Sequence, residues 1–473
     1  MDEDFDPYND GADDLELSNR FEQMLETNQN YFFDVEEFED LIDYYLEKSE
    51  LEKAKKAIDF ALYQHPNSSE LKIKHAQYLI ENHQPNKGLD ILNALENMEP
   101  FNHELFLTKA NIYSQIRQHQ KAIENYYKAV KLIDDKNEKS NIYFSIAFEY
   151  ENLSQYDKAL TILKNLLQEN PENETLIYEI SFCYNLKNDA ESSIQFFNSF
   201  IDEHPYSYLA WFSLGIAYNK AELYEKAIDA YDYAIAIKDD FSSAYFNKAN
   251  SLAMLERYED AIEVFKESNN FEEPDSSAYY YIGECYEKLE DYTNAETYYY
   301  KAINIDPYYA DAYAGIAVVS EYQKKNHIAA FYIQKAIDLE TENSEFWYIY
   351  GDILANLAKY EEAINAFNKV VEFDEENEEI CLDISEAYLN KDGIGTAIEF
   401  LSKSSKKQPE NNQLIIRLAA LLLKNGKVAD ANEKLTLALT KQPKLAEDFI
   451  EYFPEAISFT AILQTIENFN KLR

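Results

Sequence analysis

Apolar side chains recur along this chain at the spacing of one helical face, and the arrangement repeats every 34 residues. Between residues 209 and 234, Trp211, Leu214 and Tyr218 share one face of a predicted first helix, and Ala227 and Ala234 share one face of a second. Steps of 34 residues from Trp211 lead back to Ile177 and forward to Tyr245, Tyr279, Tyr313, Trp347, Cys381 and Ile415. A fixed period of this size indicates a solenoid built from repeated units.

The residue types in the repeated positions explain how two helices of one unit would pack. Small residues stand where the helices must approach closely, such as Gly215 in the first helix and Ala227 in the second. The second of these positions is Ala in a long run of copies: Ala227, Ala261, Ala295, Ala329, Ala363, Ala397 and Ala431. Proline ends the second helix in many copies, because its ring carries no N–H: Pro66, Pro100, Pro171, Pro205, Pro307, Pro409 and Pro443.

Twelve copies of the pattern fill residues 35–445. They begin near Val35, Ser69, His103, Ser140, Glu174, Tyr208, Ser242, Ser276, Ala310, Ser344, Glu378 and Asn412. Asp34 and Glu37 have the spacing of a capping box at the start of the first copy. Three extra residues, 137–139, interrupt the step before Ser140 and predict a longer loop there.

Both ends of the chain depart from the repeat. Residues 1–14 are acidic and predict a disordered tail, and residues 15–34 predict a short N-terminal helix with Leu17, Phe21 and Met24 on one stripe. That helix either caps the first copy or detaches as an interaction segment. Residues 446–473 carry a stripe containing Ile462 and Ile466 opposite polar residues, and they predict a C-terminal capping helix.

Composition narrows the possible partners. The chain of 473 residues holds 88 acidic against 43 basic side chains, a net charge of −45, which would repel nucleic acid. No apolar run approaches the ~20 residues that span a bilayer, and the acidic start differs from a signal peptide, so we expect a soluble, cytoplasmic protein.

Cys183, Cys285 and Cys381 lack metal-binding spacing and are expected to be buried thiols. No metal or cofactor is expected.

The recurring order Trp, Leu, Gly, Tyr, Ala, Phe, Ala, Pro resembles the tetratricopeptide repeat (TPR) family. The resemblance covers residues 35–445 and implies an all-α fold, an α-solenoid in which antiparallel helix pairs form a right-handed superhelix. It also implies protein binding by a scaffold or adaptor, without catalysis. The sequence shows no Gly-rich phosphate loop, catalytic triad context or metal-spaced His/Cys cluster, so we do not expect an enzyme.

In this family the first helix of each pair lines a concave groove through its second, fifth, ninth and twelfth positions. Through the middle of the array the fifth and ninth positions hold a run of aromatic residues: Phe144, Phe148, Tyr178, Phe182, Phe212, Phe246, Tyr280 and Tyr348. Acidic side chains accompany them, among them Glu284, Glu287 and Asp352. We expect an acidic, aromatic-lined groove for a partner segment in which Lys or Arg alternates with apolar residues. The alternative is that the aromatic rings pack on neighbouring helices and the carboxylates favour helix N-termini.

A second hypothesis is self-association. Residues 401–473 carry more basic than acidic side chains, whereas the first fifty residues are strongly acidic. A basic patch of Lys403, Lys406, Lys407 and Lys444 could receive the acidic end of another copy, head to tail, or the chain's own tail. Surface ion pairs are weak individually, so the adaptor function is preferred over the structural assembly.

Overall fold

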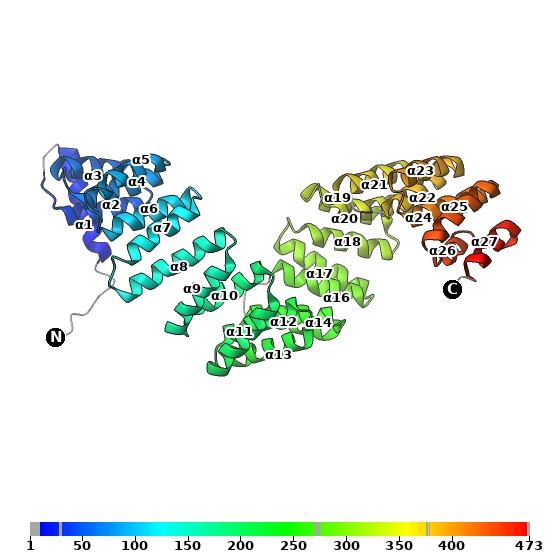
Figure 1. The fold of residues 1–473 in the computed structure, drawn as a ribbon, viewed down its shortest axis with the longest axis horizontal. Coiled ribbons are helices and arrows are strands. Elements are labelled where there is room, and N and C mark those ends of the chain that lie inside the picture. Colours follow the sequence, from blue (N-terminus) through cyan, green and yellow to red (C-terminus); the bar gives the residue numbers. More distant parts are fainter. Residues whose placement is uncertain (1–9, 28–30, 270–274, 375–376, 378, 471–473) are drawn as a thin grey trace. The chain divides into compact units, whose positions relative to one another are not determined.

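The computed structural model describes residues 10–27, 31–269, 275–374, 377 and 379–470. Within these ranges every regular element is a helix, and successive helices form antiparallel pairs, which confirms the all-α prediction (Figure 1). The chain divides into two compact units, residues 1–223 and 224–473, called here the N-terminal and C-terminal units.

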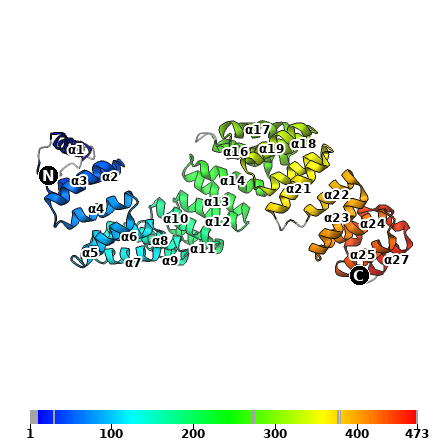
Figure 2. The same ribbon diagram turned by 90° about the horizontal axis from the view of Figure 1, so that it is seen from above.

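The N-terminal unit contains α1 (Asp10–Thr27), α2 (Val35–Glu47), α3 (Leu51–Gln64), α4 (Ser69–Glu81), α5 (Pro85–Glu96), α6 (His103–Gln115), α7 (His119–Val130), α8 (Lys136–Asn152), α9 (Tyr156–Glu169), α10 (Glu174–Lys187), α11 (Ala190–Glu203) and α12 (Tyr208–Lys220). From α2 onward the even-numbered helices are the first of each pair, called here A helices, and the odd-numbered ones are the second, called B helices. Figure 2 shows the same helices from above.

The C-terminal unit contains α13 (Tyr224–Ile237), α14 (Ser242–Met254), α15 (Tyr258–Ser268), α16 (Ser276–Lys288), α17 (Tyr292–Ile305), α18 (Ala310–Tyr322), α19 (Asn326–Leu339), α20 (Ser344–Asn356), α21 (Tyr360–Phe373), α22 (Ile380–Asp392), α23 (Ile394–Lys407), α24 (Asn412–Lys424), α25 (Val428–Lys441), α26 (Leu445–Tyr452), the 3-10 helix η1 (Pro454–Ser458) and α27 (Thr460–Asn470).

The longer loop expected at residues 137–139 is wrong. These residues form the first turn of α8, which is 17 residues long. Asp135 precedes the helix in extended conformation and its side chain accepts a hydrogen bond from the backbone N–H of Glu138 at 2.7 Å. Because this N-cap satisfies the first turn, three extra residues lengthen the helix by nearly one turn of about 3.6 residues.

The start of the chain also differs from expectation. Helix α1 begins at Asp10, so residues 10–14 belong to a helix and not to the predicted tail, while residues 1–9 and 28–30 lie outside the described part. An acidic sequence is compatible with a helix start, because negative charge is favourable near a helix N-terminus. Phe21 and Met24 of α1 are buried in one cluster with Phe38 of α2.

The predicted capping box is present at the start of α2. The Asp34 carboxylate accepts from the backbone N–H of Glu37 at 2.9 Å, and the Asp34 N–H donates to the Glu37 carboxylate at 2.8 Å. Arg20 of α1 also contacts Glu37, at 2.6 Å. The start of the repeated region is therefore held both by its own cap and by α1.

Glycines in the A helices allow large B-helix rings to pack between successive pairs. A Cβ added at Gly283 of α16 would lie 2.7 Å from the ring of Tyr299, and one added at Gly315 of α18 would lie 2.6 Å from it. Tyr299 of α17 is fully buried between these two glycines. Gly283 thus serves the close helix approach that the sequence predicted within a pair, while Gly315, at a different position of its copy, admits the same ring from the next pair; a larger residue at either glycine would displace the ring.

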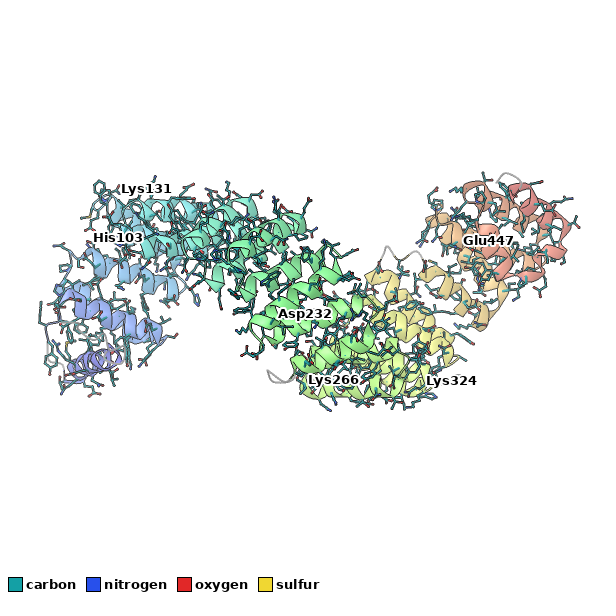
Figure 3. The ribbon with its side chains drawn as sticks, turned by 90° about the horizontal axis from the view of Figure 1, so that it is seen from below. His103, Lys131, Asp232, Lys266, Lys324 and Glu447 are labelled. Carbon is teal, nitrogen blue, oxygen red and sulfur yellow. The ribbon has the colours of Figure 1, made fainter. Side chains whose placement is uncertain are left out.

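Lysines on the B helices cover aromatic rings on their outer side. Lys266 of α15 lies with Nζ 5.6 Å from the ring centroids of both Tyr286 and Tyr298 (Figure 3). Lys301 of α17 lies closer, 4.1 Å from the Tyr298 centroid. These contacts combine cation–π attraction with shielding of the ring by the lysine stem.

The C-terminal end is more elaborate than the single capping helix expected for residues 446–473. It contains α26, the 3-10 helix η1 and α27, because Pro454 cannot continue α26. Ile462 and Ile466 of α27 are buried, and the hydroxyl of Thr465 donates to the Asn432 side chain of α25 at 2.8 Å. Helix α27 therefore covers the last B helix.

Candidate functional site

In the N-terminal unit, the predicted groove residues of α8 and α10 lie on exposed faces of those helices. Phe148 is 55% exposed, Tyr178 59% and Phe182 42%. The rings of Tyr178 and Phe182 stack with centroids 6.4 Å apart and planes inclined by 7°. Because these residues are one turn apart on α10, the stacked pair presents a continuous flat apolar surface. Phe212, on α12, is half-buried.

Phe144, the remaining predicted residue of this unit, lines a cavity of about 490 Å³ beside the first half of α8. Polar side chains form much of its remaining wall, namely Lys136, Asn137, Ser140, Asn141, Asn170 and Asn173. Lys136 pairs with Glu169 across it, Nζ to carboxylate, at 3.2 Å. The added turn of α8 contributes Lys136 and Asn137 to this wall, so the interruption of the repeat has a structural consequence at the predicted site.

In the C-terminal unit, two predicted aromatic residues pack largely on their neighbours. Phe246 of α14 is half-buried and lies edge-on to Phe265 and Tyr281, with centroids 5.4 and 5.6 Å away. Tyr280 of α16 is half-buried, and its ring centroid lies 5.7 Å from that of Tyr299. Burial, followed by nearby carboxylates, raises the pKa of Tyr280 well above its usual range.

Tyr348 of α20 is the most accessible of the three predicted aromatic residues of this unit. It is 41% exposed, and its ring centroid lies 6.1 Å from that of Phe367 on α21. Burial and then the carboxylates of Asp383 and Asp352 raise its pKa. Tyr348 therefore combines an exposed ring with an acidic surrounding, as the predicted site requires.

The predicted acidic residues of α16 lie in a partly desolvated group. Burial raises the pKa of Glu284, and Glu287 and Asp311 raise it further by repulsion. Burial also raises the pKa of Glu287, although its carboxylate accepts a hydrogen bond from the Tyr299 hydroxyl at 2.7 Å. Glu287 is thus engaged by the hydroxyl of the buried Tyr299, and Glu284 is the carboxylate of the two that is more available to a partner.

A second acidic group links α18, α20 and α22. Burial raises the pKa of Asp352 above its ordinary value. Burial, followed by repulsion from Asp352, Glu379 and Glu386, raises the pKa of Asp383 to about 6. Carboxylates of α20 and of the start and middle of α22 therefore destabilise the charged form of Asp383, which marks a surface with excess negative charge.

Asp383 was missed because the sequence interpretation considered four repeat positions, and Asp383 is the sixth residue of its copy. Helix α22 begins at Ile380, two residues after the expected start. The proximity of Asp383 to Glu379 and Glu386, four residues before and three after, is a helical-face signal that could have identified it.

Among the described residues, no group of three or more His, Cys, Asp or Glu is arranged to hold a metal ion. Likewise, no described helix has both the length and the apolar composition to cross a membrane. Cys183 and Cys285 are buried as predicted, but Cys381 is only half-buried, as are Trp211 and Trp347 at the same position of their copies. Burial raises the pKa of Cys285 to about 12, so its thiol stays protonated.

Comparison with known protein families finds matches within the repeated region of the chain. Family models described as tetratricopeptide repeat match residues 103–136, 189–240, 276–309 and 344–377. No curated protein matches the chain.

Solved structures of similar fold include the APC/C hetero-tetramer Cut9-Hcn1, at 15% identity over 84% of this chain and 91% of that one, with a TM-score of 0.41. The C-terminal part of a TPR repeat-containing protein from Cytophaga hutchinsonii is 20% identical over 51% of this chain and 99% of that one, with a TM-score of 0.44. YrrB, described as a TPR protein with an unusual peptide-binding site, is 24% identical over 42% of this chain and all of that one, with a TM-score of 0.35. With its run of antiparallel helix pairs and its family matches at four places, the chain belongs to the tetratricopeptide repeat family.

Proposed function

We propose that the chain is a non-catalytic adaptor or scaffold that binds a basic and apolar segment of a partner protein on the faces of its A helices. The observation that carries the proposal is the excess of negative charge on α20 and α22, where burial raises the pKa of Asp352, and burial followed by repulsion from Asp352 and its neighbours raises the pKa of Asp383. A lysine or arginine placed there would relieve that repulsion, and this gain exists only for a cationic partner.

Exposed aromatic rings support the apolar half of the proposal. Tyr178 and Phe182 stack on α10, and Tyr348 lies beside the carboxylates of α20 and α22. Rigid aromatic side chains supply contact area at low entropic cost and attract cations to their faces. We expect the N-terminal unit to contribute mainly stacking and the C-terminal unit mainly charge.

The test uses the full chain as bait for a peptide in which Lys and Leu alternate, with a peptide in which Glu and Leu alternate as its matched control. We expect capture of the Lys peptide at low salt, loss at high salt, and no capture of the Glu peptide. Replacing the exposed residues Tyr178, Phe182 and Tyr348 together by Ala should abolish capture, and Asp383→Asn should weaken it. Capture that survives both changes contradicts the proposed binding face.

Self-assembly is the second candidate. Lys406 and Lys407 are exposed in the last turn of α23, where positive charge is favourable, Lys403 is exposed one turn earlier, and Lys444 is exposed just before α26. A head-to-tail contact with an acidic N-terminal region would dissociate as salt screens it. Sedimentation of the full chain at low and high salt tests this: a salt-sensitive dimer supports assembly, and a monomer throughout contradicts it.

A further inference from the structure

Three hollows on the N-terminal unit adjoin one another along the B helices α9 and α11. Their volumes are about 460, 360 and 420 Å³. The first and second share Lys164, Phe196 and Ser199 in their walls, and the second and third share Pro171, Glu203 and His204. Shared walls make the three hollows one continuous depression, called here the α9–α11 furrow.

The two walls of the furrow each come from one stripe of a helix. On α9 the lining residues are Asp157, Leu160, Thr161, Lys164, Leu167 and Gln168. On α11 they are Ser192, Gln195, Phe196, Ser199, Phe200 and Glu203. Both sets are spaced three and four residues apart, which is the spacing that presents a seam to a further helix. The furrow therefore offers two parallel ridges between which one helix could pack.

The repeat pattern explains why the furrow is open at this copy. Ser199 occupies the twenty-sixth position of its copy, a position that is lysine in five others: Lys128, Lys301, Lys335, Lys369 and Lys403. In the eighth copy Lys301 covers the ring three residues before it, with Nζ 4.1 Å from the Tyr298 centroid. The equivalent ring of the fifth copy is Phe196, and serine is too short to cover it. Lys164 of α9 contacts that ring from the other wall, at 4.7 Å.

The two ends of the furrow differ in charge. At the first hollow, Lys187 is paired with Asp157 at 2.7 Å and with Asp189 at 2.9 Å, so this end is close to neutral. The third hollow is lined by Glu172, Glu174 and Glu203, and no Lys or Arg lines it in this fully described stretch. Tyr206 beside it is 84% exposed, an aromatic face available to a cation.

We propose that the α9–α11 furrow is a docking site for a single amphipathic helix of a partner protein. The apolar stripe of that helix packs on the half-buried rings of Phe196 and Phe200, beside the buried Leu160 and Leu167, and its basic end lies at the third hollow. Charge complementarity places the basic end there, because only that end of the furrow carries unneutralised carboxylates. This site uses B helices and is separate from the A-helix face proposed above, so a second partner segment can bind at the same time.

The probe is a synthetic helical peptide of about 14 residues, the length of α9, with Leu at alternating spacings of three and four and Arg at its C-terminal end. A peptide of the same composition in scrambled order controls for general attraction to an acidic protein. Fluorescence anisotropy with the full chain should show tighter binding of the ordered peptide. No binding of the ordered peptide, or equal binding of the scrambled one, overturns the proposal.

Ser199→Lys restores the residue that five other copies carry and should close the furrow, lowering the affinity of the ordered peptide by about tenfold or more. Ser199→Ala keeps the furrow open and should bind as the unaltered chain does. Thermal unfolding of both variants verifies that they fold. Affinity that is unchanged by Ser199→Lys overturns the proposal.

Two further measurements keep the proposal testable even if the lysine variant is unstable. A photoreactive group on the apolar face of the peptide should attach to residues of α9 or α11, and attachment elsewhere contradicts the site. Replacing Tyr178 and Phe182 by Ala should leave affinity for this peptide unchanged, which distinguishes the furrow from the A-helix face. Loss of affinity in that variant would show that the peptide binds the exposed face of α10 and would overturn the furrow assignment.

Discussion

The fifth position of the fifth copy and that of the eighth copy both hold tyrosine, but the two side chains have different surroundings. Tyr178 is 59% exposed and stacks only on Phe182 one turn away. Tyr280 is half-buried, and its ring meets Tyr309 edge-on with centroids 5.3 Å apart. The residue at the position of Tyr309 in the fifth copy is Ser207, which cannot reach over the ring. The residue in the turn before the next A helix therefore decides the environment of an aromatic residue at a groove position. A tyrosine in that turn buries the ring, whereas a serine leaves it exposed.

The largest expected effect is the loss of a packed ring. Tyr280→Ala should lower the free energy of unfolding by about 2–4 kcal/mol, because it leaves a cavity among rings. Tyr178→Ala should change it by less than about 0.5 kcal/mol, as for most surface substitutions. Urea unfolding followed by circular dichroism measures both variants. Equal losses would show that exposure does not separate the two positions.

Acidic crowding on α20 and α22 should appear as a pH dependence of stability. The pKa of Asp383 is raised to about 6 in the folded chain, above its unfolded value of about 3.9. Folding therefore favours the protonated form, and its contribution is fully present below about pH 4 and is lost as the pH rises through 6. Since Asp383 is only partly shielded from solvent, we expect a loss of about 1 kcal/mol between pH 4 and 7.

Asp383→Asn supplies the control for that titration. It removes the repelled charge, so the variant should be more stable than the unaltered chain at pH 7 by about 1 kcal/mol and should lose this advantage near pH 4. Denaturant unfolding at both pH values tests this. If the gain in the free energy of unfolding is the same at both pH values, its cause is not the titration of Asp383.

Exchanging the covering residues should exchange the two environments. Ser207→Tyr should shield Tyr178, and Tyr309→Ser should expose Tyr280 at a cost of about 1 kcal/mol for the lost ring contact. Nitration of tyrosine followed by mass spectrometry reports the accessibility of each ring. We expect slower nitration at Tyr178 and faster nitration at Tyr280. Unchanged rates would show that Ser207 and Tyr309 do not determine how exposed the two rings are.

The smallest effect concerns the turn between paired helices, where one residue adopts a left-handed conformation in the fifth copy and again in the tenth. Asn188 has φ 58° in the fifth copy, and Ala358 has φ 58° in the tenth. Asparagine tolerates this region better than alanine. Ala358→Asn should therefore stabilise the chain, and Asn188→Ala destabilise it, each by about 0.5 kcal/mol. Thermal unfolding of the pair checks the opposite signs.

The sequence by itself determined the repeat, the helical class and most helix starts. These depend on interactions within one helix pair, such as the small residue at Gly283 and the capping box at Asp34 and Glu37, and they recur at a fixed step. Where a local interaction was overlooked, the prediction failed: the N-cap at Asp135 turned an expected loop into the first turn of α8.

Only the tertiary structure decided which groove aromatics are exposed, which carboxylates repel one another, and where the furrow opens. Tyr178 and Tyr280 share one position in the pattern, and their burial is decided by Ser207 or Tyr309 from the next turn. The pKa of Asp383 depends on Asp352 of the preceding A helix, through a distance that periodicity does not contain. The physical reason is common to all three: burial and electrostatic repulsion depend on side chains of neighbouring repeats, whose directions follow from packing and not from spacing along one chain.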